Sequence, residues 1–193
     1  MHRVLIIRAH PREGSFANAL TDRYVAGITD SGREVREIVL SQLGLQRFVT
    51  REYTKGMALP KGVRTAQELI SWADHLVFSY PLWWAAPPAL LKVFLEQVFA
   101  PGFAFSYREP KGFVPQWDRL LTGKSARLIT TMDSPPWHYR YFIGDPAFKM
   151  MKDVLNFCGV KPVRAVYFGS VRMSSEKARK NWLEKAYRVG SSE

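Results

Sequence analysis

The sequence predicts a doubly wound α/β fold, in which a parallel sheet carries helices on both faces. Three observations lead to this fold class. Short apolar, β-branched runs alternate along the chain with longer stretches of helical periodicity, as in successive βαβ units. Some of these runs are apolar at nearly every position, as expected of strands buried on both faces. Five such strands in 193 residues suit a single domain over 1–193 with strand order 2-1-3-4-5.

The first half of the chain shows this alternation clearly. Arg3–Ala9 has the composition of a buried strand, and a helix is expected over Phe16–Thr29 because Leu20, Tyr24 and Ile28 fall on one helical face. The elements that follow are a more exposed, alternating strand at Glu34–Leu40, a helix at Val63–Trp72 and a buried strand at His75–Tyr80.

Proline and glycine help to delimit the elements of the second half. Pro87 and Pro88 are well placed to open a helix that runs to about Phe99, because the first helical turn does not need proline's missing N–H. The later elements are a strand at Ser125–Thr131, a helix at Pro146–Phe157 ending near Gly159, a strand at Val163–Val171 and a charged helix at Ser174–Gly190.

Composition limits the partners and the compartment. Lys plus Arg (28) exceed Asp plus Glu (17) by 11, a surplus that attracts phosphate-bearing cofactors, nucleic acid or acidic membranes alike. No nucleic-acid-binding motif is present, and the longest uncharged stretch, His75 to Leu91, is broken by prolines, so neither nucleic acid nor a membrane span is expected. The lone Cys158 predicts an inert core thiol and a cytoplasmic location, and the four histidines lack metal-ligand spacing, so no metal is expected.

Unusual residues follow the first, third and fourth predicted strands. In this strand order ligands bind at the carboxyl ends of the strands, where the order reverses. The loops there are rich in aromatic and hydroxyl side chains: HPREGSF at 10–16, PLWWAAPP at 81–88 and TTMDSPPWHY at 130–139. The candidate site therefore lies at this edge of the sheet.

The loop after the first strand has two interpretations. Ser15 alone is well explained as the cap of the following helix. Alternatively, the helix N-terminus binds a phosphate, with the Ser15 hydroxyl and the His10 and Arg12 side chains beside it. The glycine fingerprint of dinucleotide folds is absent, so a Rossmann-type NAD site is not supported.

The tryptophan pair after the third strand also has two interpretations. Adjacent tryptophans most often fill a core. Here they join a buried strand to a proline-started helix, so backbone N–H groups of Leu82, Trp83 and Trp84 could instead bind a planar ring while the indoles exclude water.

Taken together, three segments resemble the flavodoxin-like NAD(P)H:quinone oxidoreductase family, which includes mammalian quinone reductases and bacterial modulator-of-drug-activity and potassium-efflux ancillary proteins. The segments are His10…Ser15-Phe16…Asn18, Pro81-Leu82-Trp83-Trp84…Pro87…Ala89-Leu90-Leu91-Lys92 and Leu128-Ile129-Thr130-Thr131. The resemblance implies a flavodoxin-like three-layer sandwich and a flavin enzyme. It also implies a homodimer with the active site at the subunit boundary.

The resemblance assigns residues to the flavin. It implies a phosphate site at His10, Ser15, Phe16 and Asn18, a ring site at Pro81, Leu82, Trp83, Trp84 and Ala85, and a loop beside the ring at Thr130, Thr131, Met132 and Asp133. Tyr139 or His138 matches the family's catalytic tyrosine.

The chain departs from the family at three places. Met132 and Asp133 replace two glycines of the mammalian members, and Ile143 replaces a histidine before the Gly-Asp pair. We therefore expect a narrow slot walled by Trp137 and Tyr139. The chain is also short between Leu40 and Val63, which favours FMN, with FAD as the alternative.

The function implied is two-electron reduction of quinones or similar planar electrophiles by NAD(P)H through the flavin. The alternative is a flavin-binding regulatory protein that acts through a partner such as a transporter, docked by the basic helix at Ser174–Gly190. The sequence does not decide between NADH and NADPH, nor does it identify the physiological acceptor.

Overall fold

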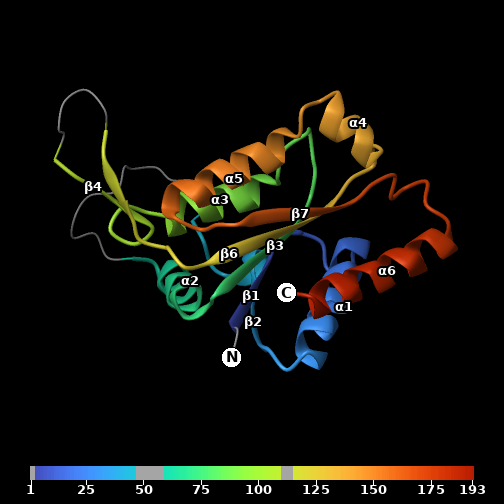
Figure 1. The fold of residues 1–193 in the computed structure, drawn as a ribbon, viewed down its shortest axis with the longest axis horizontal. Coiled ribbons are helices and arrows are strands. Elements are labelled where there is room, and N and C mark those ends of the chain that lie inside the picture. Colours follow the sequence, from blue (N-terminus) through green and yellow to red (C-terminus); the bar gives the residue numbers. More distant parts are fainter. Residues whose placement is uncertain (1–2, 47–58, 110–114) are drawn as a thin grey trace.

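The computed structural model describes residues 3–46, 59–109 and 115–193 (Figure 1). Its main sheet has five parallel strands in the order β2-β1-β3-β6-β7, which is the predicted order once two small strands, β4 and β5, are set aside. The strands are β1 (Arg3–Arg8), β2 (Glu34–Val39), β3 (His75–Pro81), β6 (Ser125–Thr131) and β7 (Val163–Phe168). The predicted fold class is confirmed.

Helices cover both faces of this sheet. One layer contains α1 (Phe16–Asp30) and α6 (Glu176–Ser191), and the other contains α2 (Lys61–Trp72), α3 (Ala89–Val98) and α5 (Pro146–Cys158) (Figure 1). The apolar strand β1 explains why both faces need cover. Its residues alternate between the layers, Leu5 packing on the α3–α5 side and Ile6 on the α1–α6 side.

A buried ionic group joins the end of the chain to the sheet. The Glu193 carboxylate accepts hydrogen bonds from the Tyr24 hydroxyl (2.7 Å) and from Arg127 Nε (2.6 Å). Burial works against the charged form of Glu193, but the bonds from Arg127 and Tyr24 and the nearby His75 outweigh it and hold the pKa of this carboxyl below its usual value. This group fixes α6 beside α1, and α1 begins at the candidate site.

Strands β4 and β5 and helix α4, all short, were not predicted. Strands β4 (Phe105–Tyr107) and β5 (Trp117–Arg119) pair antiparallel in an arm that stands away from the main sheet (Figure 1). The arm is attached by Trp117, whose ring stacks on Phe157 at 4.5 Å and whose Nε1–H donates to the Phe157 carbonyl. Helix α4 (Pro136–Tyr141) spans six residues of the predicted loop. Runs this short carry too few residues to show a period.

Several predicted boundaries shift by a few residues. Strand β7 ends at Phe168 rather than Val171, because Ser170 has a left-handed backbone (φ 54°) that turns the chain away. Helix α6 begins at Glu176, since the Ser175 hydroxyl caps it by accepting from the Ala178 N–H. Helix α2 begins at Lys61, and a short 3₁₀ helix, η1 (Leu40–Gln42), follows β2. Within the described ranges, no helix has the length and apolar character needed to cross a membrane.

Candidate functional site

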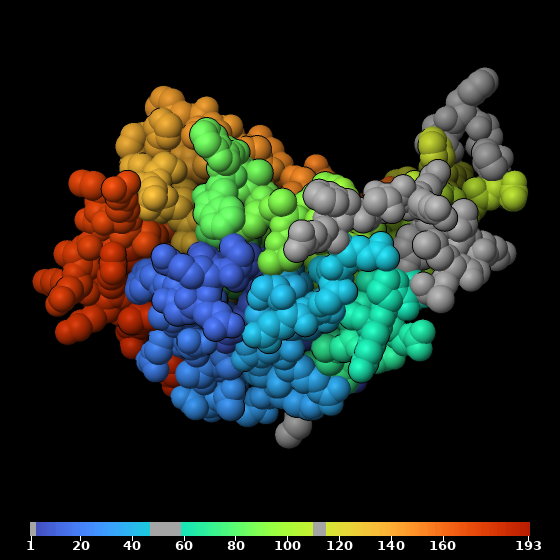
Figure 2. Space-filling model, turned by 180° about the vertical axis from the view of Figure 1, so that it is seen from behind, coloured from blue at the N-terminus to red at the C-terminus, as the bar shows by residue number. Residues whose placement is uncertain are grey.

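The structure brings together the loops that follow β1, β3 and β6. The Leu82 N–H donates to the Thr131 carbonyl (2.8 Å), which ties the β3 loop to the end of β6. The His10 and Trp83 rings meet edge to face at 6.1 Å, which joins the β1 and β3 loops. Figure 2 shows the β3 loop as a bright green knob between the blue β1 and α1 region and the gold segment around α4. The site predicted at this edge is therefore one contiguous surface.

The β1 loop is braced by its own hydrogen bonds. His10 Nδ1 accepts the Arg12 N–H (3.0 Å), and the Asn18 side-chain amide donates to the Arg12 carbonyl (3.2 Å). Partial burial, with the positive charge of Arg12, lowers the pKa of His10, so its ring is neutral at pH 7. Because Nδ1 accepts a hydrogen bond, the ring proton of this neutral form is on Nε2. His10 can therefore donate to a ligand from Nε2.

The N-terminus of α1 supplies further donors. Ser15 is buried and its Oγ accepts the Asn18 N–H (3.2 Å), so Ser15 does cap the helix, yet its own hydroxyl proton is still available. The N–H groups of Phe16 and Ala17 make no hydrogen bond with any described residue. These donors and the positive end of a 15-residue helix suit an anion such as phosphate. Both interpretations of Ser15 are compatible with this geometry.

The β3 loop is a strained two-residue turn. Trp83 and Ala86 exchange both backbone hydrogen bonds (2.9 and 3.0 Å), while Trp84 (φ 54°) and Ala85 (φ 61°) have left-handed backbones. Turns of this kind usually contain Asn-Gly, because other residues pay about 1–2 kcal/mol each for a left-handed backbone. Strain of this size at the edge where ligands bind indicates a functional constraint.

This turn leaves two backbone donors free. Of the N–H groups predicted to bind a ring, those of Leu82 and Trp83 already donate to Thr131 and Ala86. The N–H groups of Trp84 and Ala85 bond to no described residue; the resemblance places Ala85 in the ring site, although its N–H was not among the three donors named from the residues. The indoles do not fill a core within this chain, since Trp84 is fully exposed and Trp83 is about half exposed.

The loop after β6 is held mainly by the sheet. The Thr130 hydroxyl donates to the Val166 carbonyl (3.3 Å) inside the sheet, and Thr131 is buried. Met132 is buried as well, and its N–H donates to the Phe168 carbonyl (2.9 Å). Asp133 is exposed and accepts the Arg172 N–H (3.1 Å). These contacts place the backbone of this loop beside the β3 turn. Pro81 is buried at the end of β3, opposite Thr131.

The two predicted catalytic side chains lie in different surroundings. Tyr139 is buried against Met132 and Ala147, so it does not form an outer wall of a slot. His138 is exposed on α4 and stacks on Phe142 at 5.5 Å. Trp137, the other expected wall, is mostly exposed.

Comparison with known proteins identifies the family. A family model described as a flavodoxin-like fold matches residues 2–189. The chain belongs to this flavodoxin-like family. The resemblance noted in the sequence is thereby confirmed.

Two kinds of relative of this flavodoxin-like protein are informative. Over 188 residues it is 28% identical to an uncharacterized NAD(P)H oxidoreductase of Haemophilus influenzae, covering 94% of this chain and 91% of the relative. It is also 28% identical over 206 residues to mouse ribosyldihydronicotinamide dehydrogenase [quinone], covering 94% and 87%. The solved NAD(P)H:quinone oxidoreductase of Methanothermobacter marburgensis has a TM-score of 0.81 at 25% identity, covering 98% of this chain and 96% of that one.

A partly buried polar pair between β7 and the start of α5 was not predicted. The Tyr167 hydroxyl donates to Asp145 Oδ2 (2.5 Å), and burial with this bond raises the pKa of Tyr167. Asp145 has a left-handed backbone (φ 54°) and lies just before α5. The only signal in the sequence is the string Gly144-Asp145-Pro146, which marks a helix start and does not reveal the contact with β7.

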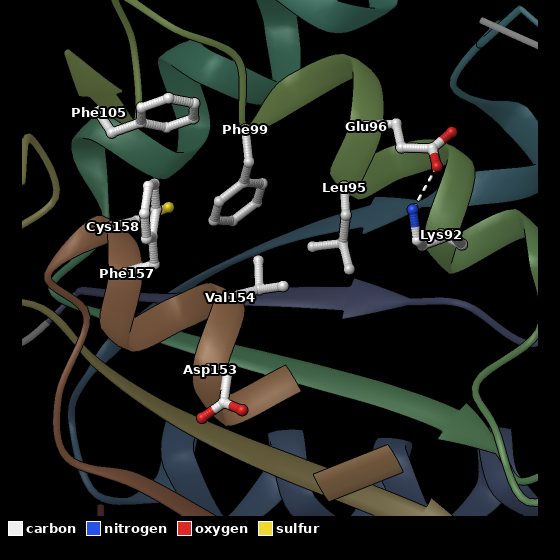
Figure 3. A pocket seen from close by; sticks show the side chains of 9 residues that line it. All are labelled: Lys92, Leu95, Glu96, Phe99, Phe105, Asp153, Val154, Phe157 and Cys158. Atoms are coloured by element: carbon white, nitrogen blue, oxygen red, sulfur yellow. Dashed lines mark hydrogen bonds and ion pairs between the residues drawn. The ribbon is translucent and has the colours of Figure 1, made fainter. Parts of the chain in front are cut away.

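An apolar groove lies on the α3–α5 face of this flavodoxin-like protein, away from the exit loops (Figure 3). Its volume is about 390 Å³, and Leu95, Phe99, Phe105, Val154 and Phe157 supply most of its apolar lining, with Lys92, Glu96 and Asp153 among its polar residues and Cys158 completing it. Burial raises the pKa of the Cys158 thiol to about 11, in keeping with the inert thiol expected there.

Proposed function

We propose that this protein is a flavin-dependent NAD(P)H oxidoreductase that reduces quinones or similar planar electrophiles by two electrons. The observation that carries the proposal is the pair of free N–H groups on the strained turn at Trp84 and Ala85. A second set of donors lies at the start of α1, across the His10–Trp83 contact. A flavin mononucleotide needs both kinds of donor, for its phosphate and for the acceptor atoms of its ring. The names of the relatives support the same reaction.

Different residues would bind the phosphate and the ring of the flavin. His10, the Ser15 hydroxyl and the N–H groups of Phe16 and Ala17 would hold the phosphate. The N–H groups of Trp84 and Ala85 would bind the ring, and Thr131 and Met132, at the end of the neighbouring strand β6 and just after it, would help to line the ring site.

The flavin, when bound, supplies the hydride chemistry, and the protein supplies position and electrostatics. Backbone donors held rigidly by a strained turn stabilise negative charge that develops on a bound ring without needing to reorganise. His138 is exposed beside this edge, and we propose that it exchanges protons with the bound acceptor.

We favour FMN over FAD. The support is the short connection between Leu40 and Val63, although residues 47–58 of it lie outside the described residues. An FMN-dependent NADH-azoreductase from Bacillus anthracis, whose structure includes FMN, shares the fold with a TM-score of 0.72 at 17% identity and coverage of 100% and 99%.

We also propose a cytoplasmic location, which rests on the single Cys158.

We further propose that the protein is a homodimer. Large apolar side chains stand exposed around the exit loops and α4: Trp83, Trp84, Trp137, Tyr141, Phe142 and Ile143. The apolar groove of Figure 3 is open as well. Contiguous exposed apolar surface marks interaction sites, and a second copy would cover both. Light scattering after size exclusion should give twice the chain mass of 22.1 kDa; a monomer at micromolar concentration would contradict this arrangement.

The function is tested on purified protein. We expect a flavin absorption spectrum, directly or after addition of FMN, and a released cofactor with the mass of FMN. The loaded protein should oxidise NADH or NADPH when menadione is supplied. Protein that takes up neither FMN nor FAD would refute the proposal.

One observation favours an alternative function. Helix α6 exposes Lys177, Lys180, Lys185 and Arg188, a basic surface that suits an acidic partner. The protein would then bind flavin but act by regulating a partner such as a transporter. Flavin-loaded protein with negligible menadione turnover would favour this alternative.

A further inference from the structure

The strained turn after β3 is fastened at one point by a side chain from another element. The Tyr139 hydroxyl, from α4, donates to the carbonyl of Ala85 (3.0 Å). The same oxygen accepts the N–H of Ala147, in the first turn of α5 (3.0 Å). One hydroxyl thus links the left-handed Ala85 to a helix that is packed in the core.

The surroundings of Tyr139 make this link rigid. The residue is 2% exposed and packs on Met132 and Ala147. Burial raises the pKa of the hydroxyl, which therefore stays protonated and remains a donor over the physiological pH range. A tyrosine has only one hydroxyl proton, and here it is directed at Ala85.

The turn needs such a link because its backbone is unfavourable. Trp84 and Ala85 both lack the freedom of glycine at positive φ. Their free N–H groups are presented only while the turn keeps this conformation. Trp84 is fully exposed and makes no packing contribution that could hold the turn in place within this chain.

We propose that Tyr139 is a positioning residue, which holds the turn at Trp84–Ala85 so that its two free N–H groups are preorganised to bind the flavin ring. This inference rests on the proposed function. It gives Tyr139 a role different from the catalytic one that the family resemblance implies, because the hydroxyl proton is engaged by protein backbone.

The test is Tyr139→Phe, with Tyr167→Phe as the matched control. Both variants remove one hydroxyl that donates to protein, but the Tyr167 hydroxyl donates to Asp145, whereas the Tyr139 hydroxyl donates to Ala85 in the turn. Fluorescence titration of the folded apo-proteins with FMN should show a dissociation constant at least tenfold higher for Tyr139→Phe. The control should stay within twofold of wild type. Equal affinities in all three proteins, or equal losses in both variants, would overturn the proposal.

A rescue experiment separates positioning from general stability. Glycine adopts a left-handed backbone without penalty, so Ala85→Gly should make the turn less dependent on Tyr139. The double variant Tyr139→Phe/Ala85→Gly should bind FMN at least threefold more tightly than Tyr139→Phe. If it binds no better, strain in the turn is not what Tyr139 opposes, and the proposal fails.

The pH dependence of turnover gives a further readout. A positioning residue leaves the shape of the kcat–pH profile with menadione unchanged in Tyr139→Phe, whereas loss of a proton donor removes one limb of it. A lost limb would therefore contradict the proposal. Failure of the wild-type protein to bind any flavin would instead refute the proposed function, so the two failures are distinguishable.

Discussion

Replacing Ala85 by glycine should stabilise the protein, whereas the same replacement at the next residue should destabilise it. Ala85 has φ 61°, and a residue with a Cβ pays about 1–2 kcal/mol for a left-handed backbone. Glycine removes that cost, but the extra conformational entropy that it gives the unfolded chain lowers the stability by about 0.4–1 kcal/mol. The net gain is about 0.5–1 kcal/mol, or roughly 1–4 °C in Tm for a chain of this size.

The matched control is Ala86→Gly. Ala86 closes the same turn through its N–H and carbonyl but is not among the described residues with positive φ. Glycine there should therefore cost about 0.4–1 kcal/mol. Urea unfolding of both apo-proteins measures the two signs. Equal destabilisation by the two substitutions would show that Ala85 is not left-handed, and the explanation of the free N–H groups would lose its basis.

Three other substitutions test separate parts of the site and its support. Trp84→Ala should weaken flavin or acceptor binding by about 1–3 kcal/mol, measured by titration of folded protein, because the exposed indole can contact a ligand; unchanged affinity for both ligands would contradict this role. Ser15→Ala should cost about 1 kcal/mol in urea unfolding, through loss of the α1 cap, and should also weaken FMN binding; unchanged stability would contradict the cap. Glu193→Gln should cost about 2–3 kcal/mol at pH 7. Because folding lowers the pKa of Glu193, its contribution is present above the unfolded pKa of about 4.3 and is lost as the pH falls through the lower folded value. The variant's deficit in urea unfolding should therefore shrink below about pH 4, and a deficit independent of pH would contradict this reasoning.

The sequence predicted the sheet because each strand can be recognised from a short local pattern of apolar residues. Strand β1 is apolar and buried at its four central positions, and only a position between two helical layers accommodates such a strand. Alternation of strands and helices then leaves few parallel topologies, and the order of the sheet follows. The arm formed by β4 and β5 was missed because strands of three residues have no measurable period.

The sequence predicted the location of the site more accurately than the individual backbone atoms that form it. The exit loops were found because Trp83, Trp84 and Ser15 are unusual residues directly after strands. Which N–H groups are free depends on the turn, and a Trp-Ala pair gives no indication of two left-handed residues. The residues alone therefore pointed to the Leu82 N–H, which is used within the protein, whereas Ala85, whose N–H bonds to no described residue, was named only through the family resemblance.

The interior partners of the site depend on contacts between distant segments. Tyr139 was singled out by its place beside the family's motif, but its bond to Ala85 spans 54 residues and no local pattern reveals it. The pairing of Tyr167 with Asp145 is equally invisible, because each residue alone is ordinary in a strand and at a helix start.

The central claim is that reducing equivalents pass from NAD(P)H to an acceptor through a flavin held at the exit loops. It is tested most directly by anaerobic mixing of the FMN-loaded protein with one equivalent of NADPH or NADH, followed by menadione, while the flavin absorption is recorded. We predict that the absorption bleaches on addition of the nicotinamide cofactor and returns in full on addition of menadione. Absorption that stays unchanged with both nicotinamide cofactors, in protein shown to be loaded with FMN, would contradict the account.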